Sequence, residues 1–464
     1  MSASQDGGTF GCQEPRPSAE RQLSRRAALA RGTLALAAAC SLTACGARPQ
    51  PVAASARPPR PEPELGNLRY GGAELAVAGE PLNGAALRRF YARHGYERVW
   101  TNRQEQAASL VNAVARAGDH GLDPEQFHAG LLLRSASLPA LRRDLLLSDA
   151  FLSYASALSS GGVPVERRRD GEALSPDPID LAAALDAAID SPDPGAAIEA
   201  LAPTTPTYRE LRQALRRHRS GAQPRGRTAG NRLREIEVNL ERQRWLPRSL
   251  PADRVWVNIA DQKLILYRAD RPVFSTRVVV GAAVESKQSP EFRTAIEASF
   301  FNPPWIIPSD IVEAEYLPRL MRDPDYLTRH NMILRDNGEI EQLPGPNAGL
   351  GAIMFDMPNR FDVYLHDTPD KHLFRRPNRR ISHGCIRVEN PREFAALLMQ
   401  QPIGAIDERI ATGSTTRTVL PTPVPVFVVY QTAFVEAGGA LQTRPDFYGR
   451  DAAIWQQLRR RSEA

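Results

Sequence analysis

The hydrophobic period of this chain changes once, near Val255, and that change constrains the fold more than any other feature. Before it, apolar residues recur at helical spacing, as over 107–117 and 145–158. After it, short runs rich in β-branched residues alternate with a period of two, as over 255–259 and 273–280. Because a segment with one period does not settle into the other structure, we expect a helical part followed by a strand-rich part.

The strand-rich part is predicted to be an all-β core, either a sandwich or a partly closed barrel. Further strand-like runs occur at 294–301, 361–365 and 425–430. Between them, residues 303–345 begin with prolines and continue as helix-like sequence. An insertion of that size in a β domain is either a lid over a site or a structural excursion. The predicted fold class is therefore multidomain α+β: a mainly helical N-terminal domain, then an all-β domain with an inserted helical capping subdomain.

Residues 1–45 have the character of an export signal rather than of a fold. A pair of arginines precedes an apolar run that is too short to span a bilayer, since spanning takes about 20 apolar residues. The run ends in LTAC, whose last residue is Cys45, and this resembles a bacterial lipobox. We expect lipidation at Cys45. The alternative is a cleaved signal peptide in which Cys45 has no role, and both the secretory and the twin-arginine export routes remain open.

The remaining boundaries follow from composition. Residues 46–66 are dense in proline and poor in large apolar residues, which predicts an extended tether. The helical domain is expected over 67–235 and the all-β domain over 236–455. The predicted location is the periplasm or cell envelope, with a lipid anchor in the outer membrane favoured because Gly46, rather than an aspartate, follows the lipobox cysteine.

The charge pattern argues against nucleic acid as a partner. The chain has 59 Lys and Arg against 53 Asp and Glu, a net charge of +6, and the two signs are interspersed. A nucleic-acid-binding surface needs basic residues clustered on one face, whereas the arginine clusters here are short, as at 216–219 and 375–380. We interpret the first cluster as a solvated surface. The second leads toward a cysteine and would attract an anionic substrate.

That cysteine, Cys385, follows a His-Gly pair in the sequence ISHGCIRVEN, and no other cysteine follows Cys45. A second histidine, His366, lies upstream in YLHDT. Exported proteins normally pair their cysteines, so a lone thiol beside candidate bases indicates covalent catalysis. The alternatives are a small core cysteine or a zinc site shared with His383, although a zinc site needs three or four ligands and the others are missing. We expect no metal and no cofactor.

The motif, a histidine, a spacer, and Ser-His-Gly-Cys with a nearby arginine, resembles the L,D-transpeptidase catalytic domain, also called the YkuD domain. Landmarks at 239–247, 302–308, 344–351 and 447–451 resemble the large YcbB-type branch of that family. Residues 90–124 are similar to the helical scaffold domain of the same branch. One departure is that the small peptidoglycan-binding module common in this branch has no room here, because only about 15 residues fill its place.

The resemblance implies an enzyme that acts on the stem peptides of peptidoglycan, the donor and the acceptor. Cys385 would attack the carbonyl of the third residue of a stem tetrapeptide, the terminal D-alanine would leave, and a thioester would remain. The side-chain amine of another stem would then attack and give a 3→3 cross-link. The same acyl-enzyme resolved by water would make an L,D-carboxypeptidase, and resolved by a protein amine an anchoring transferase. A further alternative is a non-catalytic lipoprotein that tethers the cell wall.

Three residues are expected to carry the chemistry. Cys385 is the nucleophile and His366 is the base, because a histidine of near-neutral pKa can take the thiol proton and return one to the leaving amine. His383 is a support residue or a second proton carrier. If the segment is extended, a spacing of two residues puts His383 and Cys385 on one face.

Other residues are expected to orient these groups or to bind substrate. The Asp367 carbonyl would orient the His366 ring. The backbone N–H groups of Gly384 and Cys385 are candidate oxyanion donors, with Tyr364 assisting. The residues expected to contact substrate are Arg387, Ser382 and Trp305.

Overall fold

The structure is a computed structural model, and it describes residues 65–71, 75–220, 227–436 and 439–460. The predicted export signal with Cys45 lies outside these residues. So does the predicted tether, apart from its last two positions, which begin α1 (Leu65–Leu68). Among the helices that the structure describes, none combines the length and the apolar character that a membrane crossing requires.

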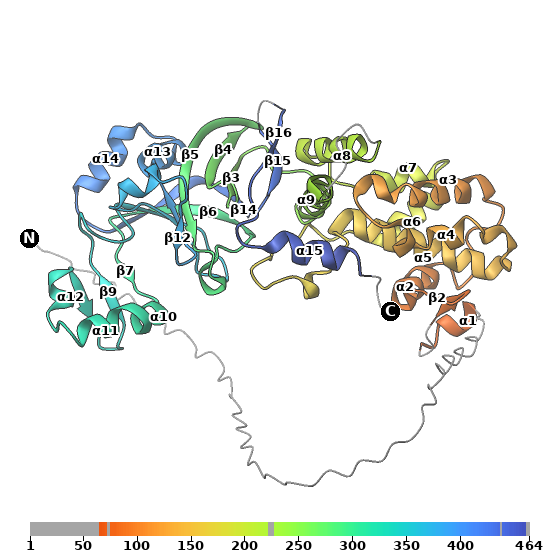
Figure 1. The fold of residues 1–464 in the computed structure, drawn as a ribbon, viewed down its shortest axis with the longest axis horizontal. Coiled ribbons are helices and arrows are strands. Elements are labelled where there is room, and N and C mark those ends of the chain that lie inside the picture. The colour runs from red at the N-terminus through yellow and green to blue at the C-terminus, as the bar shows by residue number, and fades with distance from the viewer. Residues whose placement is uncertain (1–64, 72–74, 221–226, 437–438, 461–464) are drawn as a thin grey trace, which may run out of the picture. The chain divides into compact units, whose positions relative to one another are not determined.

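The N-terminal part is helical, as expected, and is built around one long helix, α5 (Ala140–Ser160), which is buried along most of its length. Helices α2, α3, α6 and α7 pack against it (Figure 1). The other helices here are α2 (Gly84–Arg93), α3 (Gln104–Ala115), α4 (Ala129–Leu132), α6 (Leu181–Ile189), α7 (Pro194–Glu199), α8 (Pro206–Arg219) and α9 (Arg227–Arg244). Two short strands and four 3-10 turns join them: β1 (Ala76–Val77), β2 (Glu80–Pro81), η1 (Ala117–His120), η2 (Pro124–Phe127), η3 (Ser135–Ser137) and η4 (Val165–Arg167).

Capping residues fix the positions at which several of these helices and turns begin. Asp123 caps η2 by accepting the Glu125 N–H, with Pro124 at the first position, although the element is one 3-10 turn rather than a longer helix. Thr205 does the same for α8, its hydroxyl accepting the Tyr208 N–H at 3.1 Å. Helix α8 buries an apolar stripe of Tyr208, Leu211 and Leu215, and arginines occupy much of its remaining surface.

The strand-rich part forms a barrel rather than a sandwich. Its strands pair in the order β12-β5-β13-β11-β10-β6-β14-β3-β4, and β4 pairs again with β5, so the pairings close into a ring. The strands are β3 (Arg254–Asn258), β4 (Lys263–Arg268), β5 (Arg271–Gly281), β6 (Phe292–Phe301), β10 (Ile353–Asp356), β11 (Leu365–His366), β12 (Arg380–Ser382), β13 (Ile386–Val388) and β14 (Thr416–Val429). The run 361–365 was expected to be a strand throughout, but only its last residue is in β11.

The barrel core follows the predicted period of two. In β4, for example, Leu264 and Leu266 are fully buried while their neighbours are not. Two helices also pack in this domain, α13 (Pro391–Met399) and α14 (Ile403–Ala411). Phe394 of α13 meets the Phe355 ring in the core, with 4.7 Å between ring centroids. The all-β expectation therefore describes the sheet but not the whole domain.

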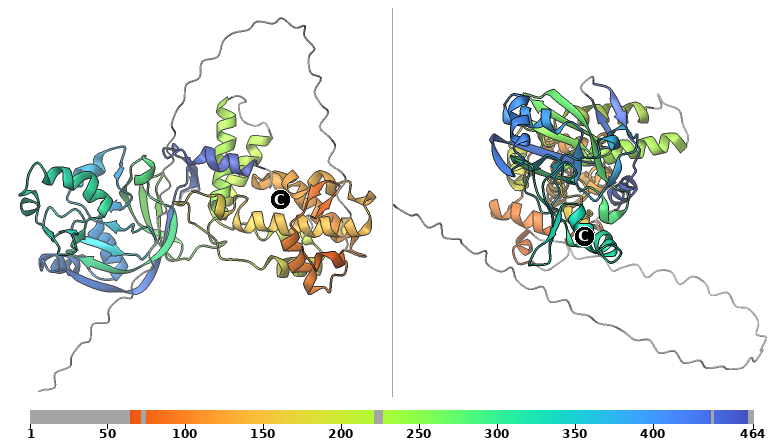
Figure 2. Two further views of the ribbon diagram at one scale, coloured as in Figure 1. Left: turned by 90° about the horizontal axis from the view of Figure 1, so that it is seen from below. Right: turned by 90° about the vertical axis from the view of Figure 1, so that its left-hand side faces the viewer.

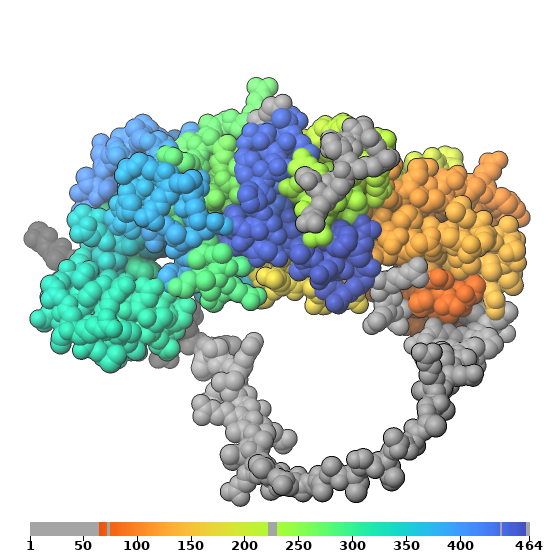
Figure 3. All heavy atoms as spheres, viewed as in Figure 1, coloured from red at the N-terminus to blue at the C-terminus, as the bar shows by residue number. Residues whose placement is uncertain are grey.

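The insertion at 303–345, which we call the cap, is mixed rather than purely helical. It contains α10 (Ser309–Ile311), the π-helical turn η6 (Val312–Tyr316), α11 (Leu317–Leu320) and α12 (Tyr326–Arg329). It also contains a three-stranded sheet in the order β7-β9-β8, from β7 (Trp305–Ile306), β8 (Met332–Leu334) and β9 (Ile340–Gln342). The space-filling view shows it as a lobe at the lower left, in turquoise (Figure 3).

The helical part and the barrel meet at α9 and the late helix α15 (Arg450–Leu458), which pack against each other (Figure 2). Helix α9 runs unbroken through the predicted boundary at 235/236. Its Asn239 side chain exchanges two hydrogen bonds with Thr432, of 2.7 and 3.0 Å. Thr432 lies just before β15 (Ala433–Val435), which pairs with β16 (Leu441–Thr443).

Candidate active site

Two neighbouring strands bring the first predicted site residues together. Strands β11 and β13 run parallel, with His366 opposite Arg387 and Leu365 opposite Ile386. Leu365 and Ile386 are fully buried in the barrel core. Because side chains alternate along a strand, His366 and Arg387 share the opposite face of the sheet.

The segment that carries Cys385 is bent, not extended. Strand β12 ends at Ser382, β13 begins at Ile386, and Gly384 between them has a φ of +120°, which only glycine adopts readily. The expectation that His383 and Cys385 share a face through strand alternation is therefore wrong. Their relative direction is set by the bend.

Ser382 fixes this bend from within. It is buried, its hydroxyl donates to the Cys385 carbonyl at 2.6 Å, and it accepts the Gly384 N–H at 3.2 Å. Both contacts are to the loop backbone, so Ser382 positions the bend, and its expected contact with substrate stays a prediction. The Gly384 N–H is thereby engaged, which leaves the Cys385 N–H as the candidate oxyanion donor.

The Cys385 side chain is partly exposed and lies 3.8 Å from the Asp362 carbonyl oxygen. Burial raises the pKa of the thiol, while the Tyr364 N–H and the Arg387 charge act in the opposite direction. The net direction is upward, so the resting group at neutral pH is a thiol. Its attack on a carbonyl requires a base.

His366 is buried, and its Nδ1 lies 2.6 Å from the Asp367 carbonyl oxygen. Burial, followed by the nearby Arg387 charge, lowers the pKa of His366 to about 4. The ring is therefore neutral at pH 7 and can accept a proton. In the described residues, His366 and Cys385 are not hydrogen-bonded to each other, as is common for catalytic pairs without substrate.

The Asp367 side chain anchors the same segment. Its carboxylate accepts the Ala352 N–H at 2.9 Å and pairs with Lys371. A Cβ atom on Gly351, whose φ is +64°, would lie 2.5 Å from Asp367. This close approach explains a glycine at 351 and holds the strand end that carries His366.

Arg387 is partly exposed, with Nη1 3.5 Å from both the Thr368 hydroxyl and an Asp370 carboxylate oxygen. Tyr364 packs against the barrel core, and burial raises the pKa of its phenol. Trp305 lies in β7, packed against the small core of the cap and close to Gly349. No contact in the described structure joins Trp305 to Cys385 or His366.

His383 meets two residues that the sequence did not single out. Its Nε2 lies 2.6 Å from Lys287 Nζ and 3.0 Å from Glu315 Oε1. Lys287 ends the 3-10 turn η5 (Glu285–Lys287), and Glu315 belongs to η6 of the cap. Isolated charged residues on a loop and on an insertion carry no motif that could have revealed them.

Family models match both parts of the chain. Residues 85–215 match the scaffold domain, and residues 252–428 match the L,D-transpeptidase catalytic domain. This chain joins a scaffold domain to an L,D-transpeptidase catalytic domain. Cys385, His366 and their neighbours lie inside the second match.

A curated relative from Haemophilus influenzae, named provisionally as an L,D-transpeptidase, is 27% identical over 403 residues, which cover 79% of this chain and 78% of the relative. Solved structures also match. The catalytic domain of the E. faecium L,D-transpeptidase, acylated by ertapenem, is 14% identical, with a TM-score of 0.20, and the match covers 39% of this chain and 99% of that one. Mycobacterium tuberculosis L,D-transpeptidase 1 is 11% identical, with a TM-score of 0.19, and the match covers 38% and 61%.

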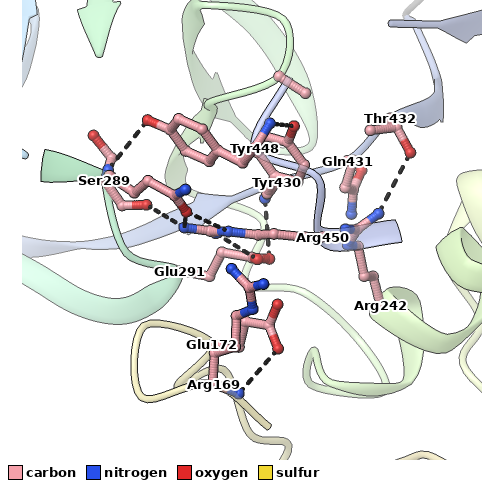
Figure 4. Close-up of polar contacts among 12 residues, drawn as sticks. Arg169, Glu172, Arg242, Ser289, Glu291, Tyr430, Gln431, Thr432, Tyr448 and Arg450 are labelled. Carbon is pink, nitrogen blue, oxygen red and sulfur yellow. Dashed lines mark hydrogen bonds and ion pairs between the residues drawn. The ribbon is translucent and has the colours of Figure 1, made fainter. Parts of the chain in front are cut away.

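Figure 4 shows a buried polar network around Arg450 and Glu291, and Ser289 of this network bonds the cysteine loop of the L,D-transpeptidase domain. Ser289 donates its hydroxyl to the Gly384 carbonyl at 2.6 Å and its N–H to the Tyr448 hydroxyl at 3.2 Å. Arg450 of α15 donates to the Ser289 carbonyl at 3.0 Å and pairs with Glu291 at 2.9 Å. Both charges of this pair are almost fully buried.

The scaffold side reaches the same network through Glu172. Residues Glu172 and Glu291 form a parallel bridge, with Ala173 N–H donating to the Glu291 carbonyl at 2.9 Å. The Glu291 N–H donates to the Gly171 carbonyl at 2.6 Å. The cysteine loop is thus connected to α15 through Ser289, and Glu291, two residues further along the chain, connects the same segment to the scaffold domain. In the described part of the chain, no group of three or more His, Cys, Asp or Glu has the arrangement of a metal site.

Proposed function

We propose that this protein is a peptidoglycan L,D-transpeptidase that forms 3→3 cross-links through a thioester on Cys385. The observation that carries the proposal is the placement of three groups in the L,D-transpeptidase domain: Cys385 follows the Gly384 bend at the start of β13, and His366 and Arg387 lie opposite each other on β11 and β13. His366 is neutral and so can accept a proton, Cys385 is a thiol that needs to lose one, and Arg387 is a cation near both.

In the acylation step, Cys385 transfers its proton to His366 and the thiolate attacks the carbonyl of the third stem residue. The C–N bond to the terminal D-alanine breaks, and the leaving amine takes the proton from His366. The Cys385 N–H stabilises the developing oxyanion. Burial keeps the Tyr364 phenol protonated, so it can donate to the same oxygen.

We assign substrate recognition to Arg387, the cation beside the thiol. Arg387 offers guanidinium donors for a stem carboxylate, and Asp370, its present partner, is more than half exposed and can yield the contact. The partners are therefore two stem peptides, a donor and an acceptor. We also propose a place in the cell envelope with a lipid anchor at Cys45. Incorporation of a labelled fatty acid tests the anchor, and we expect Cys45→Ala to abolish the label.

The decisive experiment incubates the purified full chain with disaccharide tetrapeptides and follows protein and products by mass spectrometry. We expect a thioester adduct on Cys385 and a 3→3 linked dimer. A carboxypeptidase would give only the shortened stem, and an anchoring transferase would need an added protein amine. A wild-type chain that never forms the adduct would contradict the proposal and favour the non-catalytic tether.

A further inference from the structure

One nitrogen atom of His383 faces two groups of opposite charge. Lys287 Nζ lies 2.6 Å from His383 Nε2, and Glu315 Oε1 lies 3.0 Å from the same atom. A lysine ammonium has only donors and an ionised carboxylate has only acceptors. A single ring nitrogen can accept from Lys287 or donate to Glu315, but it cannot do both in one protonation state.

The Lys287 ammonium therefore occupies a position in which any primary ammonium could be bound. A neutral ring nitrogen is available to accept from it, and a carboxylate faces that nitrogen. About one third of each of the His383 and Glu315 side chains is exposed, at 33% and 32%, so a solute amine can reach them. The other Glu315 oxygen, Oε2, lies 3.4 Å from Arg319 of the cap, which orients the carboxylate.

We propose that His383 and Glu315 form the recognition site for the acceptor amine, and that Lys287 holds this site until an acceptor displaces it. The inference rests on the proposed function, because it needs a thioester on Cys385. The ligand class is a primary alkyl amine that is cationic at neutral pH. Nothing in the donor step requires such a site.

The chemistry balances without a further reactant. The acceptor ammonium gives one proton to His383 Nε2, and Glu315 stabilises the resulting imidazolium. The free amine attacks the thioester carbonyl, the C–N bond forms and the C–S bond to Cys385 breaks. The attacking nitrogen loses its second proton to His366, which returns it to the Cys385 thiolate.

The site is divided between two parts of the molecule. His383 lies beside the Gly384 bend and so stays with the thioester, whereas Glu315 lies in η6 of the cap. Hydrolysis of the thioester needs neither the carboxylate nor the cap. Glu315 therefore selects an amine over water as the group that resolves the acyl-enzyme.

The test compares Glu315→Gln with Glu313→Gln in the full chain. Glu313 lies in the same π-helical turn and is exposed, which makes it a matched control. Donor tetrapeptide is held saturating, and a stem tripeptide with a free side-chain amine is titrated as the acceptor. Loss of a charge-assisted contact should raise the acceptor KM about tenfold in Glu315→Gln and lower the ratio of transfer to hydrolysis. Glu313→Gln should match the wild type.

The Lys287→Met variant tests the same site with a change expected in the opposite direction. Removing the resident ammonium should lower the acceptor KM, since the acceptor no longer displaces a competitor. An acceptor KM that is unchanged in Glu315→Gln, in a protein with wild-type melting behaviour and a normal thioester adduct, overturns the acceptor site alone. A wild-type chain that forms no adduct overturns the proposed function and the acceptor site together.

Discussion

The barrel and the cap are packed very differently. The barrel core draws fully buried residues from every strand of the ring and from α13, whereas the buried cluster of the cap consists of Ile307, Tyr316, Met332 and Ile340. The cap also leaves Met321 and Leu334 exposed at 80% and 63%. The proposed bond-breaking groups thus sit on β11 and on the loop before β13 of the densely packed barrel, and the proposed acceptor-selecting group sits on a thinly packed insertion. The difference suggests that cleavage of the donor and choice of the acceptor can change independently.

The largest expected effect comes from the thiol on the barrel. Cys385→Ala should abolish both acylation and cross-linking, because no other group forms the thioester. Cys385→Ser should be nearly inactive, since an alcohol is a far poorer nucleophile at neutral pH. Intact-mass analysis with tetrapeptide substrate measures the adduct. Normal cross-linking by Cys385→Ala would show that the thiol on the barrel is not the nucleophile.

The next effect concerns the base. His366→Gln should slow acylation by about 10²–10⁴-fold, the usual contribution of a general base. The depressed pKa predicts the pH profile as well. His366 is neutral above its pKa of about 4, so acylation should persist at pH 5 and decline only as the pH falls through about 4. If acylation by His366→Gln still declines as the pH falls through about 6.5, a residue other than His366 is the base.

Packing substitutions measure the difference between the two regions directly. Phe355→Ala removes a fully buried ring from the barrel, and we expect it to lower the global free energy of unfolding by about 3–5 kcal/mol. Tyr316→Ala in the cap should leave the main melting transition in place and increase hydrogen exchange in 303–345 only. If both variants lower the same transition equally, the cap and the barrel unfold as one unit.

The smallest expected effect lies at the bend. Gly384→Ala should cost about 1–3 kcal/mol and reduce acylation, because its φ of +120° strains any other residue. A Cβ atom there would meet neighbours only at 3.8 and 3.9 Å, so the cost is in the backbone. Gly404→Ala in α14 has open space around it and should be neutral or stabilising by up to about 1 kcal/mol. Equal melting temperatures for the two variants would contradict the strain.

The sequence predicted the features that depend on hydrophobic periodicity and on a local motif. The change from helical to strand period placed the two domain types, which are confirmed, and the Ser-His-Gly-Cys motif pointed to the family. It misjudged the His383–Cys385 geometry, because one glycine at positive φ replaces extended backbone and no local pattern announces it. The mixed character of the cap was missed because strands as short as β7, with two residues, leave no alternation to detect.

Long-range partners were also invisible in the sequence. Ser289 and Glu291 support the cysteine loop, yet each is an ordinary polar residue in the segment between β5 and β6 and acquires its partner only when β5, β6 and α15 come together. The contact between Glu315 and His383 depends on how an insertion folds back. The roles of the predicted site residues stay predictions, and the substitutions above are the way to test them.

The buried pair between Arg450 and Glu291 has a consequence for the order of biogenesis. Arg450 is synthesised well after Cys385, yet it supplies the hydrogen bond that holds Ser289, and Ser289 holds the Gly384 carbonyl. Without α15, Glu291 loses its direct ion-pair partner, and a buried carboxylate that lacks such a partner is costly. The support of the cysteine loop is therefore complete only once α15 has docked.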